Sequence, residues 1–240
     1  MLGSLKEYSC TEGREKALGT LCNALAVILG GILGLLFRKR FSLKVQESLM
    51  HALGLVCIPL GLSMTMRGEK FLALLLSIVA GGALGELLQL EERLEHFSQK
   101  LENRLRAERN TFAPGFLAAT LLFCIGPMTI MGSLEDGLGK VPQILYTKSL
   151  LDGTASLALA ASLGVGVPFS ALSILLVQGS ITLLARFLAP LLSEGFIREM
   201  TATGGILILG IALNLLNLKK IRVANLLPSL GFVALFMRLL

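Results

Sequence analysis

The chain is poor in charged residues and in the groups that carry enzyme chemistry. Only 16% of its 240 residues are Asp, Glu, Lys or Arg, whereas a soluble domain typically carries about 25%. Its two histidines, His51 and His96, stand at no metal-ligand spacing. It has no phosphate-binding loop, nucleophile elbow or pair of carboxylates at catalytic spacing. We therefore expect no enzyme activity, no cofactor and no metal site.

The four cysteines do not form a framework either. None of them makes a Cys-x-x-Cys pair, and Cys22, Cys57 and Cys124 fall inside apolar segments. Cysteine in such places behaves as a small apolar residue. The sequence therefore predicts neither a disulfide scaffold nor a cysteine metal site.

What the chain does have is long apolar runs, with 54% hydrophobic residues and 26 glycines. Runs of about 20 apolar residues are typical of helices that cross a bilayer. We predict an all-α, polytopic transmembrane helix bundle of seven or eight spans over residues 18–240, after a polar N-terminal tail at 1–17. The expected spans are 18–37, 47–66, 71–90, 113–132, 149–167, 170–193, 201–217 and 223–238. The last is short and contains Pro228, so it could instead be re-entrant.

The formal charge of +6 is concentrated in clusters beside the spans. Arg38–Arg40 follow the first span, basic residues recur over 93–109, and Lys219–Arg222 follow the seventh. Cytoplasmic loops carry such an excess of Lys and Arg. With eight spans, both ends of the chain are then outside. The charge indicates membrane orientation and no nucleic-acid partner.

The long connection at 91–112 is charged but periodic. Leu90, Leu94, Phe97, Leu101 and Leu105 recur at helical spacing and form one apolar stripe. We expect a cytoplasmic amphipathic helix that lies along the inner leaflet or packs on the bundle. A helix that docks a partner protein is the alternative.

Two segments suggest an internal repeat. Met50–Gly54 matches Met200–Gly204 at the Met, Ala and Gly positions, and Leu60-Gly61 matches Leu209-Gly210 after one gap. Spans one to three would then correspond to spans six to eight, in opposite orientation because five spans precede the second copy. Inverted repeats of this kind are common in transporters, with a site between the halves.

Polar residues inside spans are costly and indicate functional sites. Asp152 stands one helical turn after Lys148, so the two either orient the helix as an ion pair or form a cation or proton site. Four single amides either bond to neighbouring helices or line a shared polar lumen: Asn23, Gln178, Asn214 and Asn225.

Gly126-Pro127 interrupts the fourth span. A proline there kinks the helix and frees backbone carbonyls, and broken helices line substrate sites in several transporters. Close helix packing is an equally good explanation of the glycine. Glu135-Asp136 follows at the outer end, where we expect it to add negative charge to a mouth.

These motifs together resemble a family. The segments that carry the resemblance are Asn23–Gly31, Gly85–Leu87, Phe123–Gly126, Lys148–Gly153, Gln178–Ser180, Glu199-Met200, Gly204-Gly205, Leu213–Leu215 and Val223–Pro228. Over about residues 18–240 the chain resembles the bacterial membrane proteins grouped as domain of unknown function 554 (YdfK/YqgA type). It departs from that family at Pro127, where a small residue is usual. The resemblance implies a multi-pass protein of the bacterial inner membrane and supplies no substrate.

The leading hypothesis is a small-solute or ion transporter or channel. The alternative is a non-transporting scaffold or regulatory subunit that docks a partner through 91–112. The expected partners are the lipid bilayer, an unknown small solute or ion and a second copy of the chain, since Gly30-Gly31 and Gly81-Gly82 suit close helix contacts. The candidate pathway residues are Asn23, Gly126, Asp152, Gln178, Asn214 and Asn225.

Overall fold

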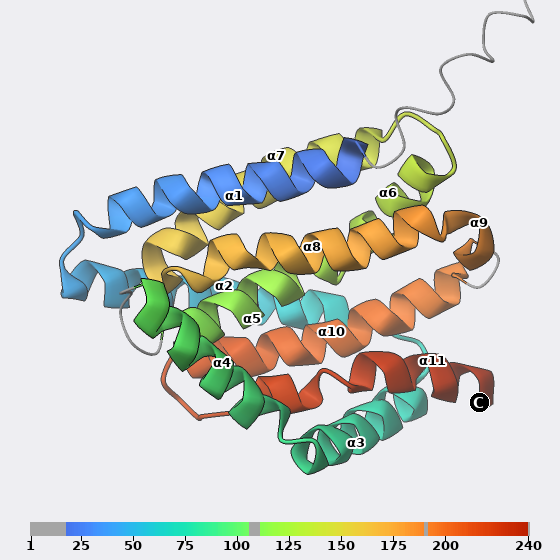
Figure 1. Cartoon of the computed structure of the whole chain (residues 1–240). Helices are drawn as coiled ribbons and strands as arrows, with labels where there is room; N and C mark the ends of the chain where they lie inside the picture. The colour runs from blue at the N-terminus through green and yellow to red at the C-terminus, as the bar shows by residue number, and fades with distance from the viewer. Residues whose placement is uncertain (1–17, 106–110, 190–191, 240) are drawn as a thin grey trace, which may run out of the picture.

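A computed structural model describes residues 18–105, 111–189 and 192–239; the predicted tail at 1–17 lies outside them. Within these ranges the regular structure is entirely helical (Figure 1). Four helices are long and apolar enough to cross a membrane: α1 (Leu18–Arg38), α2 (Leu43–Thr65), α8 (Gly166–Leu183) and α10 (Glu194–Leu215).

Two bent helix pairs are also long and apolar enough to cross a membrane when the two helices of each pair are counted as one segment. α3 (Phe71–Leu87) and α4 (Leu90–Leu105) meet at 55°, and α5 (Phe112–Cys124) and α6 (Pro127–Gly137) meet at 62°. The described residues thus contain four candidate spans, or up to six if each pair counts as one. The predicted all-helical membrane protein is confirmed at this level. The remaining elements are α7 (Gln143–Leu163), α9 (Ala185–Leu188), the 3-10 helix η1 (Val223–Leu226) and α11 (Ser229–Leu239).

Several helix boundaries differ from the predicted ones. α7 begins at Gln143, not at 149, because Lys148 is buried inside the helix and does not mark its end. α4 is described as far as Leu105, and residues 106–110 of the predicted 91–112 helix lie outside the described residues; α5 begins at Phe112. Glu102 fixes the start of α5: its Oε1 accepts the N–H groups of Thr111 (2.9 Å) and Phe112 (2.7 Å), which caps that helix.

The two faces of α1 differ in the size of their side chains. Its buried face is made of small residues and one amide, whereas Leu25 and Leu29 on the other side are 58% and 61% exposed. Leucines on the outside of a helix and small residues on the inside are typical of membrane helices. α1 therefore has one exposed apolar face and one face that packs against its neighbours.

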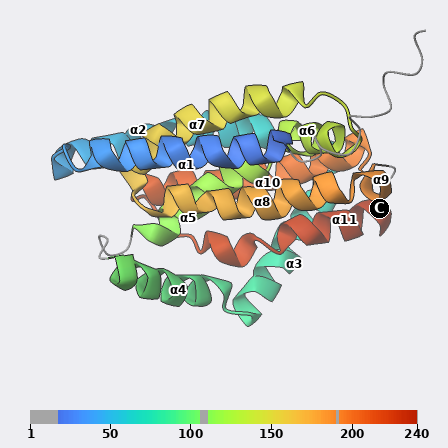
Figure 2. The ribbon, with the colours of Figure 1, turned by 45° about the horizontal axis from the view of Figure 1, so that its top comes forward.

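α1 and α7 lie side by side along their length in both ribbon views (Figures 1 and 2). A Cβ on Gly30 would overlap the carbonyl oxygen of Gly153, and one on Gly34 would overlap that of Leu157. The hydroxyl of Ser156 donates to the carbonyl of Val27 at 2.7 Å. Small residues thus let the two backbones touch.

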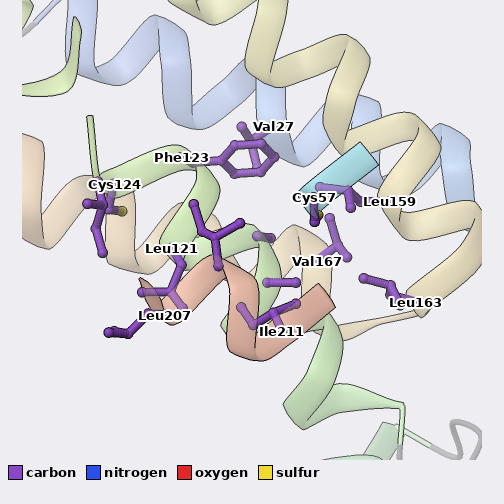
Figure 3. Packing of buried hydrophobic residues seen from close by; sticks show 14 of the residues in the cluster. Val27, Cys57, Leu121, Phe123, Cys124, Leu159, Leu163, Val167, Leu207 and Ile211 are labelled. Carbon is purple, nitrogen blue, oxygen red and sulfur yellow. The ribbon is translucent and has the colours of Figure 1, made fainter. Parts of the chain in front are cut away.

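The short helix α5 runs through the middle of the bundle. Leu121 and Phe123 are 0% and 2% exposed, and they pack against Val27 of α1, Leu159 of α7 and Leu207 of α10 in the same core (Figure 3). A helix of 13 residues is roughly 20 Å long and does not cross a bilayer by itself. Such a half-span is tolerated because protein surrounds it.

The glycines that suggested a second copy of the chain contact helices of the same chain. Gly31 of α1 meets Pro168 of α8, while Gly81 and Gly85 of α3 meet Ser229 and Asn225. α3, α4 and α11 lie along one edge of the bundle (Figure 2). These contacts account for the small residues within one chain, and a homo-oligomer stays a prediction.

Candidate functional site: a buried polar cluster between α1, α6, α7 and α8

The centre of the cluster is an ion pair inside α7. Lys148 Nζ donates to both carboxylate oxygens of Asp152, at 2.9 and 2.7 Å, and the two side chains are only 7% and 9% exposed. The predicted pairing at one helical turn is therefore present. A buried pair like this one is costly to desolvate, and its presence is weak evidence for a role in stability.

α1 adds an amide to this pair. Asn23 is fully buried, and its Nδ2 donates to Asp152 Oδ2 at 3.0 Å. Its Oδ1 is buried without a hydrogen-bond partner. The parallel packing of α1 on α7 thus brings two of the predicted pathway residues into direct contact.

α6 contributes a second carboxylate. Asp136 is 2% exposed, and its Oδ2 accepts the backbone N–H (3.3 Å) and the hydroxyl (3.4 Å) of Thr20. We expected Asp136 to add negative charge to a mouth at the outer end of the span; the structure buries its side chain where α6 packs against α1 and α8.

α8 closes the cluster from the other side. The hydroxyls of Thr20 and Thr182 are 3.2 Å apart, and α1 runs antiparallel to α8 (Figure 1). Asn23 stands one turn after Thr20 on α1, and Gln178 stands one turn before Thr182 on α8; both side chains are 0% exposed. The register therefore puts Gln178 level with Asn23, on the buried face of α8.

Several buried polar atoms of this region have no hydrogen-bond partner among the described residues. The unpaired oxygens are on side chains of α1, α6 and α8, each of which lies in the cluster or one turn from a member: Asn23 Oδ1, Ser133 Oγ, Asp136 Oδ1 and Gln178 Oε1. Gln178 Nε2 is unpaired as well. Buried polar groups are normally satisfied, so each exception requires an explanation. Carboxylate, amide and hydroxyl oxygens are the ligands of hard cations and the partners of water.

Gly126 forms the hinge between α5 and α6. Its backbone is extended, and a Cβ there would meet nothing within 4 Å, so packing does not require glycine. The hydroxyl of Thr129 donates to the carbonyl of Phe123 at 2.9 Å, which satisfies an acceptor that the broken helix frees. Cys124, also at the break, is buried in the apolar core. The hinge thus connects the core helix α5 to α6, which carries Asp136.

Asn214 and Asn225 lie elsewhere, near the loop that follows α10. Asn214 donates to the carbonyl of Ile221 (2.8 Å) and accepts its N–H (2.7 Å). Asn225 accepts the N–H of Glu91 (2.8 Å) and donates to Glu86 (2.6 Å), which also binds Arg222. Both amides hold backbone turns, and neither touches the buried cluster.

The sequence analysis missed several members of the cluster. Thr20, Ser133 and Thr182 are neutral and small, and inside spans such residues usually bond to their own helix. A signal was present in α6, where Thr129, Ser133 and Asp136 recur at helical spacing and form one polar stripe. Among the described residues no group of three or more His, Cys, Asp or Glu side chains is placed to hold a metal ion.

Apolar helices around a buried polar cluster define a helical membrane protein whose candidate site is that cluster. The chain belongs to the family described as "Protein of unknown function (DUF554)", whose match covers residues 18–238. It is 36% identical over 216 residues to the "Uncharacterized membrane protein YdfK" of Bacillus subtilis, covering 88% of this chain and 92% of that protein. It is 29% identical over 218 residues to the "Uncharacterized protein YqgA" of Escherichia coli, covering 89% and 93%. No solved structure matches it.

Proposed function

We propose that the protein is a multi-pass transporter or channel of the bacterial inner membrane that moves a small cation. The observation that carries this proposal is the set of unpaired buried oxygens beside a cluster with two carboxylates, Asp136 and Asp152, and one ammonium, Lys148. The cluster has an excess of one negative charge when all three are ionised. A cation or proton neutralises that excess, whereas an anion would increase it.

We also propose that the chain crosses the membrane eight times. The crossings are α1, α2, α3, α5 with α6, α7, α8, α10, and η1 with α11, which alternate in direction along the bundle (Figure 1). α7 contains the charged residues Lys148 and Asp152, and their pairing lowers the cost of burying each charge in a span. The basic clusters Arg38–Arg40 and Lys219–Arg222 lie at the same end of the bundle, which would be cytoplasmic.

The inverted repeat is part of this proposal, and the caps of two helices support it. α2 and α10 each begin after a serine whose hydroxyl accepts an N–H three residues on: Ser42 from Val45 (3.4 Å) and Ser193 from Phe196 (3.2 Å). Ser42 stands eight residues before Met50, and Ser193 stands seven residues before Met200. A similar cap at a similar distance from a similar sequence pattern is expected of two copies of one unit.

The contacts between the proposed copies fit a two-fold relation. Gly61 and Gly205 face each other where α2 crosses α10, each so close that a Cβ would meet the other's carbonyl oxygen. α1 likewise packs on α8, and α3 packs on η1 and α11. Each element of one proposed copy thus touches its counterpart in the other. Transporters with inverted repeats bind substrate between such halves.

Flux measurements test the transport proposal. In liposomes that contain the purified protein and a pH- or cation-sensitive dye, we expect a cation flux above that of empty liposomes. Asp136→Asn and Asp152→Asn should each lower it at least tenfold, because each removes a charge from the cluster. Glu135→Gln, beside Asp136 but outside the cluster, should leave the flux unchanged. If no monovalent cation or proton moves through the wild-type protein, the proposal is wrong.

Labelling of introduced cysteines tests the eight crossings and the repeat. In a background without the native cysteines, Ser42→Cys and Gly195→Cys place one thiol at the start of α2 and one at the start of α10. In intact cells we expect a membrane-impermeant maleimide to label position 195 and to spare position 42. Labelling of both positions from the same side would overturn the opposite orientation of the two copies.

A further inference from the structure

A groove of about 860 Å³ lies between α1 and α8 on the outside of the bundle. Its walls are apolar, and its end next to the α1–α2 loop carries two cationic side chains and a hydroxyl. The apolar walls include Ile28 and Ile32 of α1 and Ala171 and Leu172 of α8, and the polar end includes Arg38, Lys39 and Thr111. No described residue of its lining is acidic.

We propose that this groove binds one anionic phospholipid, with an acyl chain between the helices and the headgroup phosphate at the basic end. The proposal is independent of what the buried cluster transports. It rests on the length of the groove, its shape and the position of its charges.

The groove is as long as one leaflet is thick. From Ile28 to Lys39 the α1 wall advances roughly 16 Å at 1.5 Å per residue, which is about half of the roughly 30 Å hydrocarbon core. A helix of a partner protein would need a groove across the whole core. A lipid needs only one leaflet, so the groove fits a lipid better than a second membrane helix.

The floor and the rim of the groove suit an acyl chain. Ala171 on the floor is only 3% exposed and its small side chain leaves depth, whereas Ile32 and Leu172 on the two rims are 47% and 58% exposed. Gly31 of α1 faces Pro168 of α8 so closely that a Cβ would overlap the proline ring. Apolar walls on either side of a small-residue floor give an extended chain contact on three sides.

The basic end is held in place by the fold. The guanidinium of Arg38 donates to the carbonyls of Ala161 (3.5 Å) and Ser162, near the end of α7. Lys39 is exposed beside it. Lys and Arg close to the cytoplasmic surface attract anionic headgroups, each by a severalfold increase in affinity. A phosphate at this end would meet two cations while its acyl chain occupies the groove.

The absence of tryptophan from the chain allows a direct measurement. Leu172→Trp introduces a single fluorophore on the rim of the groove, and Val79→Trp introduces one on α3, where Val79 is 62% exposed at a similar distance from the same end. The full chain is reconstituted into phosphatidylcholine vesicles that contain small amounts of brominated phosphatidylglycerol or brominated phosphatidylcholine. Bromine quenches the tryptophan of any site that the lipid occupies.

We expect brominated phosphatidylglycerol to quench the tryptophan at position 172 about fivefold more effectively than brominated phosphatidylcholine, with no such preference at position 79. Lys39→Gln should reduce the preference at position 172 to below about twofold. Lys44→Gln, which removes a cation from the same end of the bundle outside the groove, should leave it intact. Each variant is used only if its melting temperature matches that of its parent.

Three results would overturn the proposal. Equal quenching by the two lipids at position 172 would show that the headgroup is not recognised. Equal effects of Lys39→Gln and Lys44→Gln would show a general surface charge. Relief of the quenching by inorganic phosphate in the buffer would show a site for free phosphate rather than for a lipid.

Discussion

Asp152→Leu will destabilise the protein by about 3–5 kcal/mol, because it leaves the ammonium of Lys148 buried without its counter-ion. The two side chains are 7% and 9% exposed, and Lys148 Nζ donates a hydrogen bond to each carboxylate oxygen of Asp152. The substitution also removes the acceptor of Asn23 Nδ2. In a low-dielectric interior an unpaired charge costs far more than the pair itself contributes.

The double variant Lys148→Met/Asp152→Leu separates this penalty from the loss of packing. Because it removes both charges, we expect it to recover most of the stability that Asp152→Leu loses. Both are compared with the wild-type protein by unfolding in detergent micelles, and Thr154→Val, at an exposed site of α7, serves as the control. If the double variant is as unstable as the single one, the pair is not the source of the effect.

The same comparison bears on function. A pair that serves only structure would leave the double variant stable and its flux unchanged. A pair that belongs to a cation pathway would leave it stable and inactive, since both the negative charge beside Asn23 and the ammonium that balances it are gone. Stability and flux measured on one variant therefore distinguish the two interpretations of Lys148 and Asp152.

Local spacing was enough to predict some features of the cluster. The long apolar runs define the helices, and the four-residue spacing of Lys148 and Asp152 predicts their pairing within α7. Gly126-Pro127 predicts the break between α5 and α6, which the structure places at that point. Each of these features depends on neighbours along the chain.

Contacts between distant segments could not be predicted in the same way. Asn23 meets Asp152 only because α1 and α7 run parallel in one register, which depends on glycines such as Gly30 and Gly153 rather than on any polar pattern. Asp136 follows a glutamate and precedes a glycine, a composition typical of a loop. It is buried because the 62° bend returns α6 to the bundle, and a sequence pattern does not state the angle of a bend.

The amides show the same limit. Asn23 and Asn225 look alike in the sequence, as single amides in or beside apolar segments, but one lies in the buried cluster and the other holds a turn between Glu86 and Glu91. The difference arises from the α3–α4 bend, which brings two glutamates to η1. The residue type alone contains no information about this.

Gly30→Ala will destabilise the protein by about 2–3 kcal/mol, although alanine is the better helix former. The added Cβ would overlap the carbonyl oxygen of Gly153, which is backbone and cannot rotate away. Gly179→Ala is the matched control, because a Cβ at that helical glycine meets nothing within 4 Å. There the helix propensity of alanine should raise stability by up to about 1 kcal/mol.

The two alanine substitutions should therefore shift the unfolding midpoint in opposite directions, and shifts in the same direction would refute close α1–α7 packing. The effect should extend to the cluster, because Gly30 and Asn23 stand two turns apart on the same face of α1. To admit a methyl group at Gly30 the helices must separate or slide, which lengthens the 3.0 Å bond from Asn23 to Asp152. The folded fraction of Gly30→Ala should then conduct less than wild type, whereas Gly179→Ala should conduct normally.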